Sequence, residues 1–145
     1  MIRITRETDY GIVLLSHLSN GQAQQIHTAR GLSTVAGLPL PMVSKILKAL
    51  ARSGLLVSHR GAKGGYSLAR RPEDVSVGDV IGALEGPVGI TECASSPGSC
   101  DQESTCPISS RWQEISETVR EYLERIPITH LINSVPLPQI GMKCS

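Results

Sequence analysis

Three cysteines in one polar segment are the residues of this sequence best suited to chemistry. Cys93, Cys100 and Cys106 are separated by six and then five residues, with Ser, Gly, Pro and Thr around them. A thiolate is a soft metal ligand, and three of them on one segment favour a metal ion or an iron–sulfur cluster. The spacing is wider than the C-x2-C pair of a zinc knuckle, whereas iron–sulfur ligation tolerates open spacing. A disulfide switch and unrelated thiols are the alternative interpretations.

Three thiolates leave a 2Fe-2S or a 4Fe-4S cluster one ligand short. An oxygen or an imidazole from elsewhere would complete the set, and the candidates are Glu7, Asp9, His17 and Glu92. Asp9 lies one turn into the first predicted helix, where a carboxylate also interacts favourably with the helix dipole. From there it could reach the cysteine segment of a partner subunit. The predicted metal site consists of Cys93, Cys100 and Cys106, and Asp9 of a partner subunit is one candidate for the open fourth position.

Basic residues gather in the middle of a chain that is nearly neutral overall. The 145 residues carry a formal net charge of +1, yet residues 41–71 contain seven Lys and Arg and no Asp or Glu. Such a block predicts a surface that binds an anion, such as the phosphates of DNA. Aromatic residues make up 3% of the chain and Phe is absent, which argues against recognition of bases by stacking. A chain of this length can bury one modest core and carry an appendage.

The elements that must position these residues follow from the apolar spacing. Helices are predicted at residues 5–18, 28–36 and 41–53, and Pro41 suits the first turn of the third. The second and third helices are short and joined by a few residues containing Gly37. This pattern is typical of a helix-turn-helix, in which the third helix enters the major groove of double-stranded DNA.

A wing is predicted after the third helix. Two strand-like runs, residues 55–58 and 65–69, flank a basic, glycine-rich turn at residues 59–64. Ser76 can then cap a fourth helix, with Asp79 three residues further on. The fold class is therefore mainly α with a small β-wing. The predicted DNA contacts are Pro41, Met42, Ser44, Lys45, Lys48, Arg60, Lys63, Gly64 and Tyr66.

A long amphipathic helix is predicted after the cysteines. Ile108, Trp112, Ile115, Val119, Tyr122 and Ile126 repeat in steps of four and three, the spacing of a seam between two helices. The economical partner is the same helix of a second subunit, so we expect a homodimer on a pseudo-palindromic site. The expected organisation is a DNA-binding domain at 1–87, a cysteine segment at 88–107, a dimerisation helix and short segment at 108–134, and a tail at 135–145.

Several classes of protein are excluded by what the sequence lacks. It contains no run of about 18 apolar residues and no signal-peptide order at its start, so we expect a cytoplasmic protein without a membrane partner. No nucleophile is paired with a base at recognisable spacing, and no phosphate-binding glycine motif accompanies a strand and a helix. An enzyme is therefore not expected.

Taken together, these residues resemble the IscR/NsrR-type family of bacterial winged-helix iron–sulfur transcription regulators, across about residues 1–134. The motifs that carry the resemblance are residues 1–10, 38–50, 54–66 and 77–86, together with the three cysteines. Within the family the sequence looks most similar to the regulators of the SUF iron–sulfur assembly operon. The resemblance implies a homodimeric repressor whose cluster state changes its affinity for a promoter.

The same resemblance bears on the ligands. Cys93, Cys100 and Cys106 fall on the family's cluster cysteines. Ser109 stands where the IscR branch places a histidine ligand, which favours the use of Asp9. Two rival functions use the same residues: a regulator that senses thiol oxidation or nitric oxide, and a small iron–sulfur carrier or electron-transfer protein.

Overall fold

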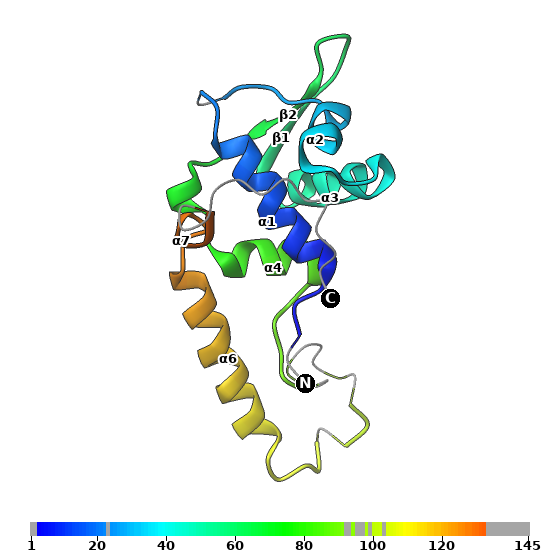
Figure 1. Cartoon of the computed structure of the whole chain (residues 1–145). Helices are drawn as coiled ribbons and strands as arrows, with labels where there is room; N and C mark the ends of the chain where they lie inside the picture. Colours follow the sequence, from blue (N-terminus) through cyan, green and yellow to red (C-terminus); the bar gives the residue numbers. More distant parts are fainter. Residues whose placement is uncertain are drawn as a thin grey trace.

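The fold is mainly helical and contains one two-stranded antiparallel sheet, as expected from the sequence (Figure 1). The computed structural model describes residues 3–22, 24–91, 94, 98, 100–102 and 104–132. Its elements are α1 (Arg6–Ser19), α2 (Ala29–Ala36), α3 (Leu40–Arg52), β1 (Leu56–His59), β2 (Gly65–Leu68), a 3-10 turn (Pro72–Asp74), α4 (Val77–Glu85), α6 (Ser109–Arg125) and α7 (Thr129–Ile132).

Local capping explains where the first helices begin and end. The Thr5 side chain accepts a hydrogen bond from the N–H of Thr8 at the start of α1. Thr28 does the same for the N–H of Gly31 at the start of α2. Gly37 ends α2 with a left-handed backbone at φ 69°, which glycine adopts without steric cost. The chain then turns by 119° into α3, within the range of a helix-turn-helix.

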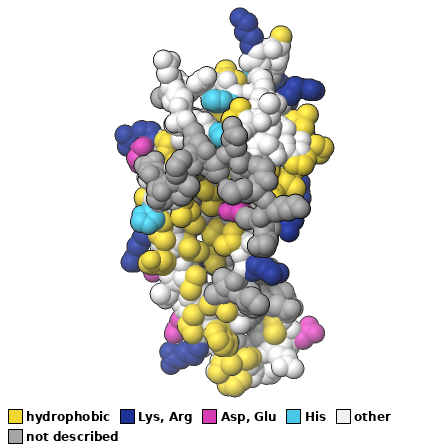
Figure 2. Space-filling model, viewed as in Figure 1, with side chains coloured by type: hydrophobic (Ala, Val, Ile, Leu, Met, Phe, Trp, Pro, Cys, Tyr) yellow, Lys and Arg dark blue, Asp and Glu magenta, His cyan; other side chains and the backbone are white. Residues whose placement is uncertain are grey.

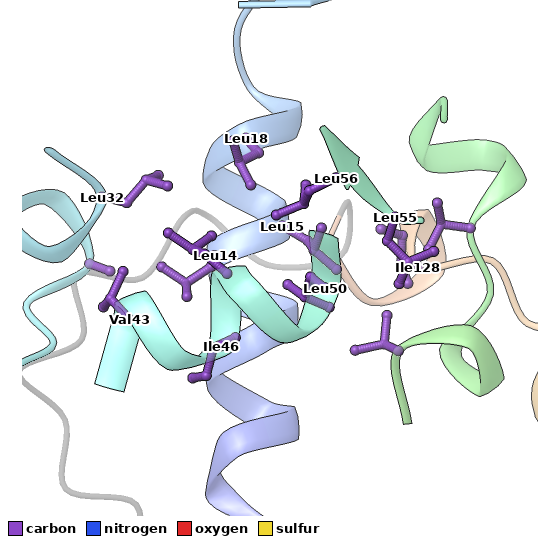
Figure 3. Packing of buried hydrophobic residues seen from close by; sticks show 14 of the residues in the cluster. Leu14, Leu15, Leu18, Leu32, Val43, Ile46, Leu50, Leu55, Leu56 and Ile128 are labelled. Carbon is purple, nitrogen blue, oxygen red and sulfur yellow. The ribbon is translucent and has the colours of Figure 1, made fainter. Parts of the chain in front are cut away.

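One hydrophobic core holds the helices and the wing together. It is built from leucines of α1, the inner face of α3 and the start of β1, as Figure 3 shows. Leu14, Leu15 and Leu50 are fully buried in it. Ile128, which follows α6, is also fully buried in this core, so the chain packs again against the first helices after its long helix.

The wing is the β1–β2 hairpin, in register from Leu56 opposite Leu68 to His59 opposite Gly65. Its base is extended by an isolated bridge, because His27 and Tyr66 exchange two backbone hydrogen bonds of 2.8 and 2.7 Å. A Cβ atom on Gly65, whose φ is +154°, would overlap the carbonyl oxygen of His27. The segment before α2 and the wing can approach this closely only because position 65 is glycine.

The first residues of α4 hold the end of α6 at two places, around Ser76 and at Gly78. Ser76 forms the predicted capping box with Asp79, with backbone-to-side-chain bonds of 2.9 and 3.0 Å. Ser76 also bridges Pro127: the N–H of Val77 donates to the carbonyl of Ile126, and the N–H of Ile128 donates to the carbonyl of Val75, each at 2.8 Å. Further along α4, Gly78 touches α6 so closely that a Cβ would lie 2.9 Å from Glu124 Cγ. The exit of α6 is therefore held against the start of α4.

Among the described residues, no single helix has both the length and the apolar character needed to cross a membrane, and only the bent α2–α3 pair meets those two criteria jointly. The predicted tail at 135–145 lies outside the described residues.

Candidate nucleic-acid interface and cysteine segment

The outer face of α3 presents the cations predicted to meet DNA. Lys45 and Lys48 are exposed, as is Pro41 in the first turn. Ser44 is half-buried, and Met42 is partly buried against the hydrophobic core. The buried face of α3 consists of Val43, Ile46, Leu47 and Leu50. The helix is therefore anchored on one side and free on the other, as a helix that enters a groove must be.

The tip of the wing presents two more cations. Arg60 and Lys63 are exposed in the turn between β1 and β2. The turn is tight, because the N–H of Gly64 donates 2.9 Å to the carbonyl of Gly61 and Gly61 has φ +104°. A Cβ on Gly64 would lie 2.5 Å from the carbonyl oxygen of His59. Figure 2 shows Lys and Arg side chains at this end of the molecule.

Tyr66, the remaining predicted DNA contact, lies at the base of the wing. Its backbone pairs with His27, and its half-buried side chain packs against the core. It therefore joins the wing to the helical domain.

Ion pairs divide the basic block into two groups. Lys45 Nζ lies 2.6 Å from the Glu7 carboxylate on α1. Arg70 and Arg71 turn towards acids, at 3.4 Å from Asp79 and 3.1 Å from Asp74. Four other cations of the block form no ion pair within the described part of the chain: Lys48, Arg52, Arg60 and Lys63. The charge available to an anion is thus concentrated on α3 and the wing tip.

The described residues just before α6, 104–108, lie at the opposite end of the molecule from the wing (Figure 1). Cys100 and Cys106 are half-buried free thiols just before α6, and Cys93 lies outside the described residues. The backbone of Cys106 is held in a turn, with its N–H 2.7 Å from the Gln102 carbonyl. Asp9 is exposed on α1. The described residues of one chain bring no three His, Cys, Asp or Glu together, so Asp9 does not complete a site with Cys100 and Cys106 there.

The chemistry of these donors suits an iron–sulfur cluster. Two soft thiols, Cys100 and Cys106, belong to one short segment, and both are free rather than joined in a disulfide. They precede the N-terminus of α6, where the helix dipole favours negative charge. An anionic, thiolate-bound group is therefore compatible with this position.

A strap holds the start of the cysteine segment on α6. The Ser116 hydroxyl, on the only α6 residue that is buried, accepts the N–H of Ile90 at 3.0 Å. Arg120 donates to the carbonyl of Val88 at 3.0 Å and pairs with Glu117. Sequence reasoning missed this strap, because a serine and an arginine on a polar helix carry no signal of their partners 26 and 32 residues away.

Sequence reasoning also missed the partner of Lys45. Glu7 was a candidate cluster ligand, and the structure pairs it instead with a cation of α3. The two residues lie 38 positions apart, so only the packing of α1 on α3 could reveal the pair.

A helix-turn-helix formed by α2 and α3, a basic β1–β2 wing and a long helix after them define the class of winged helix-turn-helix DNA-binding proteins. Residues 4–134 match the model of the Rrf2 family, described as an iron-dependent transcriptional regulator, and the chain belongs to this family. Protein rrf2 of Nitratidesulfovibrio vulgaris is 26% identical over 136 residues, which cover 94% of this chain and 91% of that protein. The regulator IscR of Escherichia coli O1:K1 is 27% identical over 134 residues, covering 92% and 82%.

Solved structures support the same fold. CymR of Staphylococcus aureus superposes with a TM-score of 0.62 at 28% identity, covering 91% of this chain and 99% of that one. CymR of B. subtilis, described as its global cysteine regulator, has a TM-score of 0.66 at 24% identity, covering 94% and 100%. The family membership confirms the resemblance to IscR-type regulators and the prediction that the chain is a DNA-binding transcriptional regulator and not an enzyme. It gives no support to the carrier interpretation.

Proposed function

We propose that this regulator senses iron–sulfur status and represses SUF-type cluster-assembly genes as a homodimer on a pseudo-palindromic promoter site. The observation that carries the proposal is the placement of two free thiols beside α6, at the far end of a fold whose other end exposes a basic reading surface. The family description as iron-dependent and the similarity to IscR support it.

In this proposal α3 and the wing bind the DNA. Lys48 on α3, and Arg60 and Lys63 on the wing, are exposed cations without a protein ion pair in the described chain. From the major groove Lys48 would contact phosphate or a guanine edge, while Arg60 would reach phosphate or the minor groove. These contacts lose affinity steeply as salt rises, because each releases counterions from the DNA.

In this proposal α6 forms the dimer interface. Ser116 is its only buried residue, although the helix has 17 residues. Four apolar residues at its start and along its length are exposed, at 52%, 37%, 45% and 64%: Ile108, Trp112, Ile115 and Tyr122. Figure 2 shows hydrophobic side chains gathered along this part of the molecule. An apolar stripe of this length is expected to be covered, and a second α6 covers it by two-fold symmetry.

The ligands would be Cys93, Cys100 and Cys106, with Asp9 of the partner subunit as the fourth. A bound 2Fe-2S or 4Fe-4S cluster would supply a group that oxidants and iron limitation can remove. The hydrogen bonds of Ser116 and Arg120 join the start of the cysteine segment to α6. Through them, a change in the segment on cluster binding would alter the position of α6.

The fold provides a route from the thiols to the DNA. The exit of α6 is bonded to α4 through Ser76 and Pro127, and α4 packs on both α1 and α3. A change in how two α6 helices pair would alter the separation of the two reading helices. A coupling of about 1 to 3 kcal/mol changes affinity about 5- to 150-fold, which suffices for a switch.

The test begins with anaerobic purification, an absorption spectrum, and iron and sulfide counts. Loaded and stripped protein are then compared in a gel shift on the promoter of the chain's own operon. Trp112, the only tryptophan, lies in the first turn of α6 and should lose fluorescence when the cluster is present. A variant with Cys93, Cys100 and Cys106 changed to Ala should stay folded and dimeric but lose the response. Unchanged response in that variant would contradict the proposal.

A second candidate is a thiol-redox or nitric oxide sensor that uses the same cysteines. The free, half-buried thiols of Cys100 and Cys106 and the structural likeness to CymR favour it. Iron-free protein treated with peroxide separates the two candidates, because only a thiol sensor would then change its affinity for DNA.

The dimer has its own test. Ile115→Glu places a charge in the exposed apolar stripe and should yield monomers in light scattering after size exclusion. Ser110→Glu adds the same charge at an exposed position outside the stripe and should leave the dimer intact. A dimer that survives Ile115→Glu would show that another surface joins the subunits.

A further inference from the structure

An apolar groove lies between α6, the end of α4 and the N-terminal segment. It has a volume of about 320 Å³ and is lined mainly by apolar residues, six of them aliphatic: Ile4, Ile81, Val88, Ile90, Val119 and Leu123. Val119 and Leu123 both belong to the C-terminal half of α6. The volume is at the lower end of the range of pockets that hold small organic molecules, so the groove has room for one large side chain.

The two halves of α6 differ in what covers them. In the C-terminal half, Val119 and Leu123 are half-buried, and the close approach of Gly78 to Glu124 packs this half on α4. In the N-terminal half, the apolar side chain of Trp112 is exposed, as is that of Ile115. Figure 1 shows that this half extends beyond α4, away from the wing. The chain's own elements therefore cover one half of the helix and leave the apolar side chains of the other half exposed.

A two-fold pair of α6 helices can run parallel or antiparallel, and the two arrangements bury different surfaces. In a parallel pair, the exposed N-terminal halves cover each other at the far end of the molecule, away from the groove. In an antiparallel pair, the exposed half of one helix lies along the C-terminal half of the other, beside the groove. The antiparallel pair therefore buries the exposed half of α6 and the apolar groove in one contact.

The length of α6 determines which residues meet in such a pair. The helix spans Ser109–Arg125, so an antiparallel pair that overlaps along its full length is centred on Glu117 and brings Trp112 opposite Tyr122. This position is next to Leu123 in the lining of the groove. Trp112 is the only tryptophan of the chain, and tryptophan is among the residues most enriched at the pocket-filling positions that anchor interfaces.

The groove also offers an acceptor for the indole N–H. Glu85 lines it, and the Oε1 atom of Glu85 accepts a hydrogen bond of 2.9 Å from the backbone N–H of Thr5. The carboxylate is thus held at the groove through one oxygen, and its second oxygen can accept a further hydrogen bond. A buried indole N–H needs such an acceptor, whereas an aliphatic side chain does not. The groove therefore suits a tryptophan better than an isoleucine of the stripe.

We propose that this groove binds the side chain of Trp112 of the partner subunit, in a dimer whose α6 helices run antiparallel. By two-fold symmetry each subunit inserts one tryptophan and receives one. The inference rests on the proposed homodimer, and it adds the residue that anchors the dimer and the orientation of its helices. It does not depend on a bound cluster.

The contact would connect the cysteine segment of one subunit to the DNA-binding elements of the other. Trp112 follows Cys106 by six residues and lies in the first turn of α6. The groove wall contains Ile81 and Glu85 of α4, and α4 packs on α3. A change at the cysteines that displaced Trp112 would therefore act on the partner's α4, one element away from its reading helix.

The orientation is tested by cross-linking in the full chain with all four cysteines changed to Ser. Ile108 and Ile126 flank α6, and an antiparallel pair centred on Glu117 brings them opposite each other while leaving Trp112 in place. Within one helix these positions are about 27 Å apart, too far for a disulfide inside one chain. On oxidation with oxidised glutathione, we expect the variant with both Ile108→Cys and Ile126→Cys to form covalent dimers in denaturing electrophoresis. The Ile108→Cys variant alone should run as a monomer.

The binding of Trp112 in the groove is tested by its fluorescence in the same Cys-free chain. We expect blue-shifted emission and slow quenching by acrylamide in the dimer, with a red shift and faster quenching on dilution to the monomer. Ile4→Ser removes part of the groove wall and should produce the red shift and the faster quenching at concentrations where light scattering shows a dimer. Val35→Ser, at an exposed position of α2 outside the groove, should change neither.

Three results would overturn the inference. Cross-linking of Ile108→Cys alone, as efficient as that of the double variant, would show that the helices are parallel. A dimer in which the double variant forms no cross-link would exclude the register, and a native Trp112 spectrum in Ile4→Ser would place the indole outside the groove. Light scattering of the Cys-free parent distinguishes these results from a failure of the proposed function, because a monomeric parent would contradict the homodimer itself.

Discussion

The ammonium group of Lys45 on α3 lies 2.6 Å from the carboxylate of Glu7 on α1. This pair joins the reading helix to the first turn of the helix that carries Asp9. Both side chains reach solvent, at 70% and 38% exposure, so the pair contributes little to stability. We expect its main effect to be on DNA binding, because Glu7 places a negative charge next to a cation that is predicted to face phosphate.

Glu7→Gln should therefore strengthen DNA binding. Removing one carboxylate beside the reading helix is expected to raise affinity about two- to fivefold at low salt, with the free energy of unfolding changed by less than about 0.5 kcal/mol. Fluorescence anisotropy on promoter DNA at several salt concentrations measures this. Glu114→Gln removes a carboxylate that pairs with Arg111 on α6 and serves as the control. Equal affinity of the Glu7→Gln variant and the native protein would show that Glu7 does not influence the interface.

Lys45→Gln tests the other half of the pair. If Lys45 leaves Glu7 for a phosphate, the substitution should weaken binding to all sequences alike and reduce the salt slope by about one. The same anisotropy titrations decide it, on promoter and on unrelated DNA. A loss confined to the promoter would instead assign Lys45 to base recognition.

Two glycines of α4 offer a matched pair. A Cβ on Gly78 would lie 2.9 Å from Glu124 Cγ and 3.0 Å from its backbone nitrogen, whereas a Cβ on Gly82 meets nothing within 4 Å. Gly82→Ala should raise the free energy of unfolding by about 0.5 to 1 kcal/mol through helix propensity. Gly78→Ala should lower it by about 1 to 3 kcal/mol, because α6 must shift. Urea unfolding compares them, and equal effects would mean that α6 is not closely packed on α4.

The sequence predicted the features that are local. The capping box of Ser76 and Asp79, the break at Gly37 and the hairpin were all predictable, because each depends on residues a few positions apart. The pairing of Glu7 with Lys45, and the return of Ile128 to the core, were not. They depend on how helices pack, which periodicity does not encode. The three cysteines were identified from residue type alone, and their fourth ligand stays a prediction.

Gly65→Ala should damage the wing without unfolding the domain. The added methyl group would overlap the His27 carbonyl oxygen, and the backbone of an alanine is strained at φ +154°. The His27–Tyr66 hydrogen bonds should open, at a cost of about 1 to 3 kcal/mol, and DNA affinity should fall at least tenfold because the wing loses its anchor. Circular dichroism and gel shifts measure the two effects, with Gly82→Ala as the control. If the Gly65→Ala variant bound DNA with native affinity, the wing would not depend on the His27–Tyr66 hydrogen bonds.

Acidification should destabilise the protein through His17. Burial and His27 lower the pKa of His17 in the folded state, while the unfolded chain keeps the ordinary value near 6.5. Below that value the unfolded state therefore binds more protons, and the free energy of unfolding falls with pH until the lowered pKa is passed. In EDTA, His17→Gln should flatten this fall between pH 7.5 and 5.5, measured by urea unfolding, whereas His130→Gln should preserve it. A parallel decline in the native protein and the His17→Gln variant would place the proton uptake elsewhere.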